Sequence, residues 1–250
     1  MTITAPFVPG LTLDIAPRLS YRVVMASTAP FDHLAARYDA WFETPEGRTI
    51  FDEEVEALLL IKGRTPGKWL EVGVGTGRFA SAFGVEEGVD PSPSMLDHAN
   101  RRGVHTQLGT AEKLPYEDGT FDGVLVVTTL CFTTDPARSL LEFARVLKSA
   151  GAVVIGLIPA SSPWGREYAR RGALGHELFS HARFLEVDET VRLAAVAGFK
   201  LVDAASTLLR PPGEPLLGPH LVERGAELAV GIEPAAEVAA ADPEDQLLDA

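Results

Sequence analysis

Hydrophobic residues along the chain form two alternating patterns, short continuous apolar runs and longer segments with helical spacing. Continuous runs rich in β-branched residues are typical of parallel strands that are covered on both faces. Spacings of three and four residues predict amphipathic helices, as in the segment from Ala137 to Leu147 that follows Asp135-Pro136. Strands that alternate with helices in this way indicate an α/β fold with a doubly wound, mostly parallel sheet.

Seven strands are expected from the apolar runs. They cover Lys68–Val72, Val85–Val89, His105–Leu108, Phe121–Val127, Ala152–Ile158, Lys200–Leu208 and Ala226–Ile232. The runs at 121–127 and 152–158 have the most continuous β-branched character, so we expect them at the centre of the sheet. A link rich in proline and glycine joins the last two strands and favours a hairpin at the sheet edge, which makes the last strand antiparallel.

The two ends of the chain differ from this central region. Residues 1–28 show no sustained period, and we expect a flexible N-terminal extension there. Residues 233–250 hold six acidic residues, no basic residue and many alanines, so they cannot bury enough apolar surface to offset chain entropy. We therefore expect one domain over residues 29–232, followed by a disordered acidic tail.

Composition excludes several classes of function. The formal net charge is -13, whereas nucleic-acid binders normally carry a basic surface, so a nucleic-acid partner is not expected. The single cysteine, Cys131, excludes an internal disulfide framework and a multi-cysteine zinc site; it fits a reducing compartment, and the cytoplasm is our expectation. No run of about 18 apolar residues is present, so no membrane span is expected.

A glycine-rich turn follows the first expected strand. Gly73-Val74-Gly75-Thr76-Gly77 lies between that strand and a segment that can begin a helix at Arg78. Glycines in such a turn permit positive φ and let the backbone approach a ligand without a Cβ in the way. Asp90 lies at the end of the next strand, where a carboxylate can accept hydrogen bonds from both hydroxyls of a ribose. The two features together predict a nucleotide-type cofactor, although a tight structural turn is the simpler alternative for the glycines alone.

Four ordered motifs carry a family resemblance. They are the segments from Glu71 to Gly77, from Gly88 to Leu96 and from Ala111 to Pro115, and the pair Phe121-Asp122; the helix end from Ala144 to Lys148 is a further match. Together they resemble the ubiquinone/menaquinone-biosynthesis type of class I methyltransferases, over roughly Phe31 to Ile232. The resemblance implies a Rossmann-like fold, S-adenosylmethionine as the cofactor and a small molecule as the methyl acceptor.

The resemblance also implies roles for individual residues. In that family the glycine loop holds the methionine part of the cofactor, the acid after the second strand holds the ribose, and the segment beginning at Ala111 lies along the adenine. The expected cofactor-binding residues are Tyr38, Glu71, Gly73, Gly75, Gly77, Asp90, Pro91, Met95, Ala111, Glu112, Leu114 and Thr128. One departure is Thr110, which stands where many relatives have an aspartate against the adenine amino group.

Two other functions are compatible with the cofactor turn. An NAD(P)-dependent oxidoreductase is the nearest, because the residues from Gly75 to Ala80 satisfy the pattern G-x-G-x-x-A. It leaves Glu71 and the motifs beyond Asp90 unexplained. The second is a binding protein of the same fold without turnover, which the intact glycines argue against. A methyltransferase for nucleic-acid amino groups is disfavoured, because Thr128 to Phe132 replaces the Asn/Asp-Pro-Pro-aromatic motif of that class.

Aromatic residues and a histidine are the candidates on the acceptor side. Methyl transfer from a sulfonium is an in-line displacement that needs no metal, and aromatic rings attract the cationic donor. Trp41, Phe42, Phe132 and Trp164 are expected to contact the acceptor, although packing explains such aromatics equally well. The segment of about residues 159–184 follows the fifth strand and is expected to be a lid over the acceptor. Within it His181 is the candidate general base, with a purely structural role as the alternative.

Overall fold

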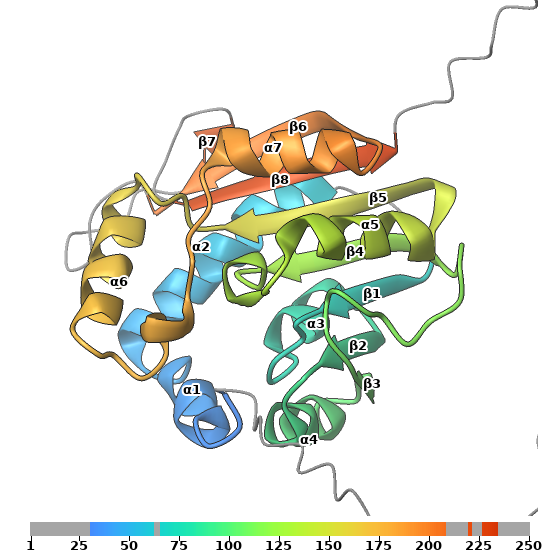
Figure 1. The fold of residues 1–250 in the computed structure, drawn as a ribbon. Coiled ribbons are helices and arrows are strands. Elements are labelled where there is room, and N and C mark those ends of the chain that lie inside the picture. The colour runs from blue at the N-terminus through green and yellow to red at the C-terminus, as the bar shows by residue number, and fades with distance from the viewer. Residues whose placement is uncertain (1–30, 63–65, 209–219, 222–226, 235–250) are drawn as a thin grey trace, which may run out of the picture.

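The computed structural model describes residues 31–62, 66–208, 220–221 and 227–234. Its helices are α1 (Ala35–Trp41), α2 (Pro45–Lys62), α3 (Arg78–Phe83), α4 (Pro93–Arg101), α5 (Pro136–Val146), α6 (Pro163–Ala173) and α7 (Val187–Val196), with 3-10 turns η1 (Leu130–Phe132) and η2 (Phe179–His181). Its strands are β1 (Trp69–Val72), β2 (Glu87–Asp90), β3 (His105–Leu108), β4 (Phe121–Val127), β5 (Leu147–Leu157), β6 (Phe199–Thr207), β7 (His220–Leu221) and β8 (Glu227–Pro234). Figure 1 shows the elements in one α/β unit.

One sheet contains all the described strands, in the order β3-β2-β1-β4-β5-β8-β6-β7. The first five strands pair in parallel, and β8 lies antiparallel between β5 and β6. The doubly wound fold and the antiparallel last strand are therefore confirmed. The expected number of seven strands was one too few, because β7 is a two-residue strand inside the proline-rich and glycine-rich link. A strand of that length leaves no periodic pattern in the sequence.

Two strands extend by two or more residues beyond their expected bounds, and other strand ends differ by one or two residues. β5 begins at Leu147 instead of Ala152, because Phe121 pairs with Leu147 before a register shift brings Gly123 opposite Ala152. The residues between are polar or small, and Lys148, Ser149 and Ala150 are exposed, so the apolar pattern missed them. β8 extends to Pro234, two residues into the segment expected to be disordered. The rest of that acidic tail and the N-terminal extension lie outside the described residues.

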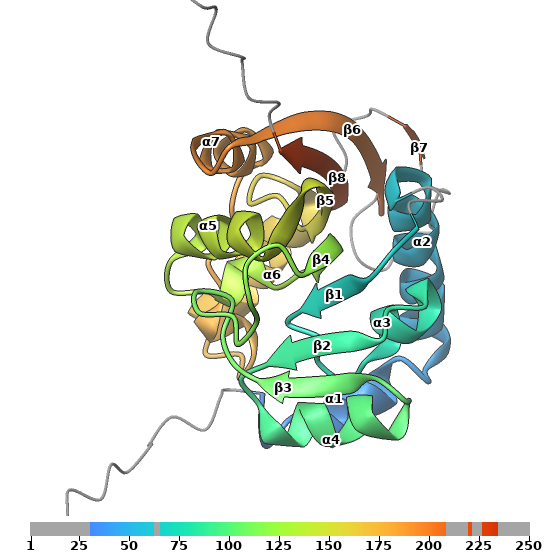
Figure 2. The ribbon, with the colours of Figure 1, turned by 90° about the vertical axis from the view of Figure 1, so that its right-hand side faces the viewer.

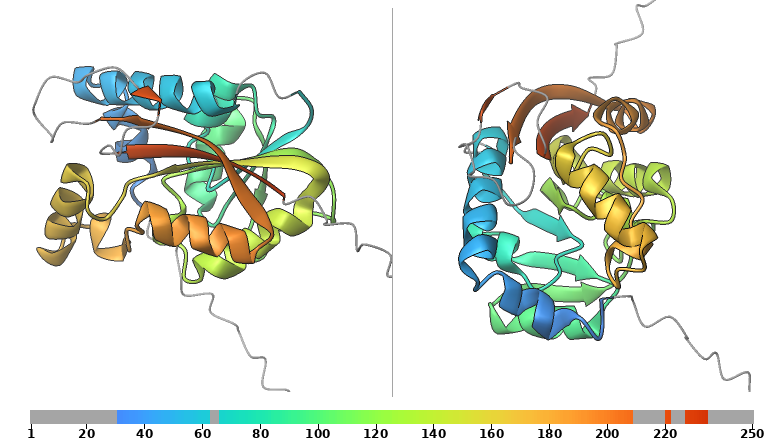
Figure 3. Two further views of the ribbon diagram at one scale, coloured as in Figure 1. Left: turned by 90° about the horizontal axis from the view of Figure 1, so that it is seen from above. Right: turned by 90° about the vertical axis from the view of Figure 1, so that its left-hand side faces the viewer.

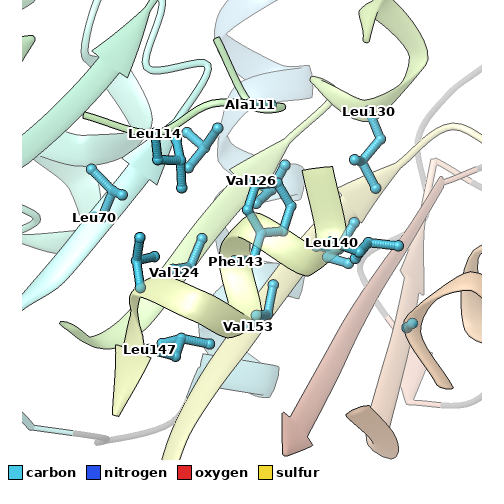
Figure 4. Close-up of a cluster of buried hydrophobic side chains, with 14 of the residues drawn as sticks. Leu70, Ala111, Leu114, Val124, Val126, Leu130, Leu140, Phe143, Leu147 and Val153 are labelled. Atoms are coloured by element: carbon cyan, nitrogen blue, oxygen red, sulfur yellow. The ribbon is translucent and has the colours of Figure 1, made fainter. Parts of the chain in front are cut away.

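Helices cover both faces of the sheet. Figure 2 and the view from above in Figure 3 show α5 and α7 on one face and α2 with α3 on the other. Under α5, the buried side chains include Leu70, Phe121, Leu140 and Phe143, which form the core cluster drawn in part in Figure 4. The opposite core contains Leu58, Phe79 and Leu96 from the other layer of helices. Coverage on both faces explains why the central strands are continuously apolar.

Two segments extend beyond the sheet on the side of the strands' carboxyl ends. Figure 1 shows α1 and α6 on the side to which the arrowheads of β4 and β5 point. α1 precedes the first strand in the chain, and α6 lies in the segment expected to be a lid. In open α/β sheets this edge is where ligands bind. Among the described residues, no helix is both long and apolar enough to cross a membrane.

Candidate cofactor and acceptor site

Three glycines shape the turn between β1 and α3. Gly73, Gly75 and Gly77 all have positive φ, at 72°, 51° and 79°. A Cβ on Gly73 would lie 2.2 Å from Thr129 Oγ1, and one on Gly77 would lie 2.9 Å from Ala99 Cα. A Cβ on Gly75 would meet nothing closer than 4.0 Å. Two of the glycines therefore permit close packing behind the loop, while Gly75 presents bare backbone on its open side.

Asp90, the last residue of β2, binds the glycine loop directly. Its Oδ2 accepts a hydrogen bond from Gly75 N at 3.0 Å, and its Oδ1 accepts one from Ser92 N at 2.9 Å. The side chain is buried, and this burial raises its pKa to about 6 against the two backbone hydrogen bonds. Each carboxylate oxygen can accept a second hydrogen bond. The geometry is therefore compatible with the expected bonds from ribose hydroxyls.

Glu71 is a second buried carboxyl group at the same edge. It is 1% exposed, and its Oε2 has no hydrogen-bond partner. Burial raises the pKa of Glu71 well above its usual value, although hydrogen bonding from the Ala80 backbone opposes the shift. A buried polar atom without a partner is costly, and an ammonium group would satisfy it. S-adenosylmethionine carries such a group on its methionine part, so Glu71 fits this cofactor.

The remaining residues expected around the nucleoside have different surroundings. Met95 is fully buried at the start of α4, whereas Pro91 is exposed. Ala111 and Leu114 are buried in the core cluster of Figure 4. Glu112 is half-buried, and its Oε1 accepts hydrogen bonds from Thr134 N and Oγ1 at 2.8 and 2.9 Å. Through these hydrogen bonds Glu112 fixes the segment just before α5.

Thr128, directly after β4, has an unusual backbone conformation. Its φ is 46°, in the left-handed region that β-branched residues rarely adopt. Thr128 N donates to Gly156 O at 2.8 Å, and the next residue, Thr129, fills the space that a side chain on Gly73 would need. Such strain costs about 1 to 3 kcal/mol and concentrates at functional sites. The conformation thus supports the expectation that Thr128 lies at the cofactor site.

Tyr38 on α1 lies close to both buried acids. The pKa of its hydroxyl is raised above the usual value, first by burial and then by the carboxylates of Glu54, Glu71 and Asp90. Its ring makes an edge contact with Phe42, at 5.2 Å between ring centroids. The structure therefore brings Tyr38 together with two of the expected cofactor-binding residues, from a segment 33 positions before Glu71.

The four expected acceptor-side aromatics lie in three different environments. Phe132 on η1 is half-buried, and its ring makes an edge contact with Phe31 at 4.9 Å. Phe42 is buried and lies under the guanidinium of Arg78. Trp164 is buried in a small cluster that includes Trp41 at its border. Phe132 and Trp41 are therefore the two more accessible rings, while Phe42 and Trp164 have clear packing roles.

The segment of residues 159–184 folds into α6 and η2. Its Glu177 bonds to His33 and Arg37 of the α1 region, and Arg183 N donates to Cys131 O at 2.7 Å. The segment is thus attached on one side to α1 and on the other to η1. His181 is exposed at the end of η2. The structure gives His181 a place within the segment expected to be a lid, but among the described residues no hydrogen bond or ion pair orients its ring.

Four charged residues at the edge of the site were not anticipated from the sequence. Asp32 precedes α1 and Asp39 lies within it, and each bonds to groups that border the cofactor loops. Their main partners include Arg78, directly after the glycine loop, and Arg102, directly after α4. The partners in these ion pairs lie far apart in the sequence, so no local pattern predicts that they meet.

Comparison with known proteins identifies a family. The model of the family described as "Methyltransferase domain" matches residues 70–155. An uncharacterized protein of Mycobacterium tuberculosis is 43% identical over 179 residues, which are 72% of this chain and 63% of that protein. An uncharacterized protein of Methanocaldococcus jannaschii is 37% identical over 181 residues, 72% of this chain and 85% of that protein. The chain thus spans less than two thirds of the length of the mycobacterial relative.

A solved structure extends the comparison to nearly the whole of a related chain. It is a Thermotoga maritima protein described as "SAM-dependent methyltransferase, possible histamine N-methyltransferase", with 35% identity and a TM-score of 0.74. The match covers 82% of this chain and 97% of the Thermotoga chain. The chain therefore belongs to the S-adenosylmethionine-dependent methyltransferase family.

Proposed function

We propose that the protein transfers the methyl group of S-adenosylmethionine to a small-molecule acceptor. The observation that carries this proposal is the arrangement at the carboxyl edge of the sheet. There the open side of Gly75, the unpartnered Oε2 of Glu71 and the buried carboxyl group of Asp90 lie together beside α1. This donor set matches the backbone, ammonium and ribose requirements of the cofactor.

Each group has a distinct role in this proposal. Glu71 would bind the ammonium of the methionine part, and Asp90 would accept hydrogen bonds from the ribose. The cofactor supplies an electrophilic methyl group on a sulfonium. The protein's own contribution is to hold donor and acceptor in line and to exclude water. Tyr38 would cover the site from α1, and Thr128 would border it from the end of β4.

The acceptor is proposed to bind between η1, α1 and the α6–η2 segment. The formal charge of -13 disfavours a polyanionic substrate. Phe31, Phe132 and Tyr38 offer aromatic surface from the two neighbouring segments. Because such rings attract cations, amines are the first acceptors to test. The Thermotoga protein, described as a possible histamine N-methyltransferase, gives the same priority.

His181 is proposed as the general base for an acceptor that is protonated at neutral pH. Its place in the segment between α6 and α7 supports this role, since the segment adjoins η1 and α1. The ring is exposed, so it would have to turn toward a bound acceptor. A base of this kind is needed only for a protonated amine or a hydroxyl, because an ionised thiol reacts without one.

Two measurements test the function. Isothermal titration with S-adenosylhomocysteine and with NAD should show binding of the first ligand and none of the second. A screen of small amines, phenols and thiols with methyl-labelled donor should then identify a methylated product. Tight binding without any product across the screen would favour the non-catalytic alternative. Binding of NAD in place of S-adenosylhomocysteine would refute the proposal.

A further inference from the structure

A cluster of opposite charges joins α1 to the cofactor loops. Asp39 on α1 accepts hydrogen bonds from Arg78 Nε and from Arg102 Nη2, both at 2.9 Å. Arg78 Nη2 also donates to the Asp39 carbonyl oxygen at 2.9 Å. The side chains of Asp39, Arg78 and Arg102 are 17%, 15% and 27% exposed. These pairs are therefore shielded from solvent far more than ordinary surface ion pairs.

Both arginines are attached to the glycine loop. Arg78 is the residue directly after Gly77, so its position follows the end of the loop. Arg102 Nη1 donates to the carbonyl oxygen of Thr76, inside the loop, at 2.9 Å. A single carboxylate on α1 thus holds two side chains that fix the same stretch of backbone.

A second aspartate holds the chain just before α1. Asp32 Oδ1 accepts hydrogen bonds from Ser92 Oγ and from Ser94 N, both at 2.9 Å. Ser92 N in turn donates to Asp90 Oδ1. The α1 region is therefore bonded to the loop after β1 through Asp39 and to the loop after β2 through Asp32. Within α1 itself Ala35 is fully buried, and Tyr38 and Trp41 make partly buried aromatic contacts, so these polar bonds act together with apolar packing to attach the helix.

We propose that Asp39 is a positioning residue, which sets the glycine loop and α1 in the arrangement that binds the cofactor. The inference rests on the proposed function, since it concerns affinity for S-adenosylmethionine. Although burial opposes ionisation, the hydrogen bonds from Arg78 and Arg102 hold the pKa of Asp39 at about 2. The carboxylate is thus charged throughout the neutral range. Its removal would leave two shielded guanidinium groups without their shared partner and release the loop from α1.

The test compares four variants by titration with S-adenosylhomocysteine at pH 7.5. Asp39→Asn keeps the size of the side chain and removes its charge, and Arg102→Gln breaks the same contact from the residue directly after α4. We expect each to raise the Kd at least about tenfold, the effect of losing a charge-assisted hydrogen bond. Asp39→Glu keeps the charge and should recover most of the affinity. Glu43→Gln is the matched control, because Glu43 also bonds to Arg78 but is 56% exposed.

A second readout separates positioning from general stability. Arg37, the exposed residue before Tyr38, offers a trypsin site whose cleavage reports release of α1. In the unsubstituted protein, S-adenosylhomocysteine should slow this cleavage, and in Asp39→Asn the protection should be lost at equal ligand concentration. Circular dichroism and the Tm confirm that each variant is folded.

The outcomes are distinct. A raised Kd in Asp39→Asn and Arg102→Gln, with recovery in Asp39→Glu and no change in Glu43→Gln, supports the proposal. A Kd within twofold of the unsubstituted protein in Asp39→Asn and Arg102→Gln overturns it, even when their Tm falls. Absence of S-adenosylhomocysteine binding in the unsubstituted protein defeats the proposed function itself, and this inference with it.

Discussion

Asp90→Asn isolates the role of the buried acid at the end of β2. In the native structure both carboxylate oxygens accept backbone hydrogen bonds, from Gly75 N and Ser92 N. The amide keeps the shape of the side chain but offers one acceptor oxygen, so it cannot satisfy both donors and the ribose hydroxyls. Losing hydrogen bonds to a charged group costs about 1.5 to 3 kcal/mol, equivalent to a 10- to 150-fold weaker affinity for S-adenosylmethionine.

The pH dependence of unfolding gives an independent measure of how much the Asp90 carboxyl group contributes to the free energy of unfolding. The pKa of Asp90 is raised from 3.8 to about 6, so between these values the folded protein retains a proton that the unfolded chain has lost. Stability contributed by this group is therefore greatest below pH 3.8 and falls as pH rises through 6. A rise in the pKa from 3.8 to about 6 corresponds to about 3 kcal/mol. Relative to the native protein, Asp90→Asn should gain this amount of stability between pH 4 and pH 7.

Binding should show the opposite trend. The ionised form of Asp90 is the better acceptor, so native affinity for S-adenosylhomocysteine should fall about tenfold from pH 7 to pH 5, as the carboxylate protonates. Asp90→Asn should show a flat profile. Urea unfolding and calorimetric titration at several pH values measure the two quantities, with Asp97→Asn on the exposed side of α4 as the control. Parallel pH profiles in Asp90→Asn and the native protein, or an unchanged Kd at pH 7, would refute the reasoning.

Three further changes test other parts of the site. Gly73→Ala places a Cβ 2.2 Å from Thr129 Oγ1 at a positive φ and should abolish measurable S-adenosylhomocysteine binding. The control is Gly84→Ala, where the new Cβ meets no atom within 4 Å. It should cost only about 1 kcal/mol of stability and leave binding intact. Glu177→Gln should leave the Tm within about 2 °C of the native value, since exposed ion pairs contribute little to stability. It should nevertheless raise the KM of the acceptor severalfold, and an unchanged KM argues against a lid. His181→Gln should lower turnover roughly 100-fold at neutral pH with cofactor affinity preserved, and a loss of Tm without loss of turnover would assign His181 a structural role.

Local sequence was sufficient for the framework of this protein. The continuous apolar runs at 121–127 and 152–158 predicted central strands, because strands covered on both faces have no polar side to alternate with. The glycine loop and Asp90 were also visible, since a turn and a strand end are local features whose chemistry depends on neighbours in the chain. The antiparallel last strand followed from the composition of its connecting link.

Other features depended on contacts between distant segments. β7 and the first residues of β5 are strands because a neighbouring strand pairs with them, so their own sequences carry no signal. The same holds for Asp39, which acquires its role from Arg78 and Arg102, 39 and 63 residues further along the chain. Hydrophobic periodicity records which face of an element is buried, but it does not record which charged side chains the fold brings together. Only the tertiary structure could show that α1 and both cofactor loops share one network of ion pairs and hydrogen bonds.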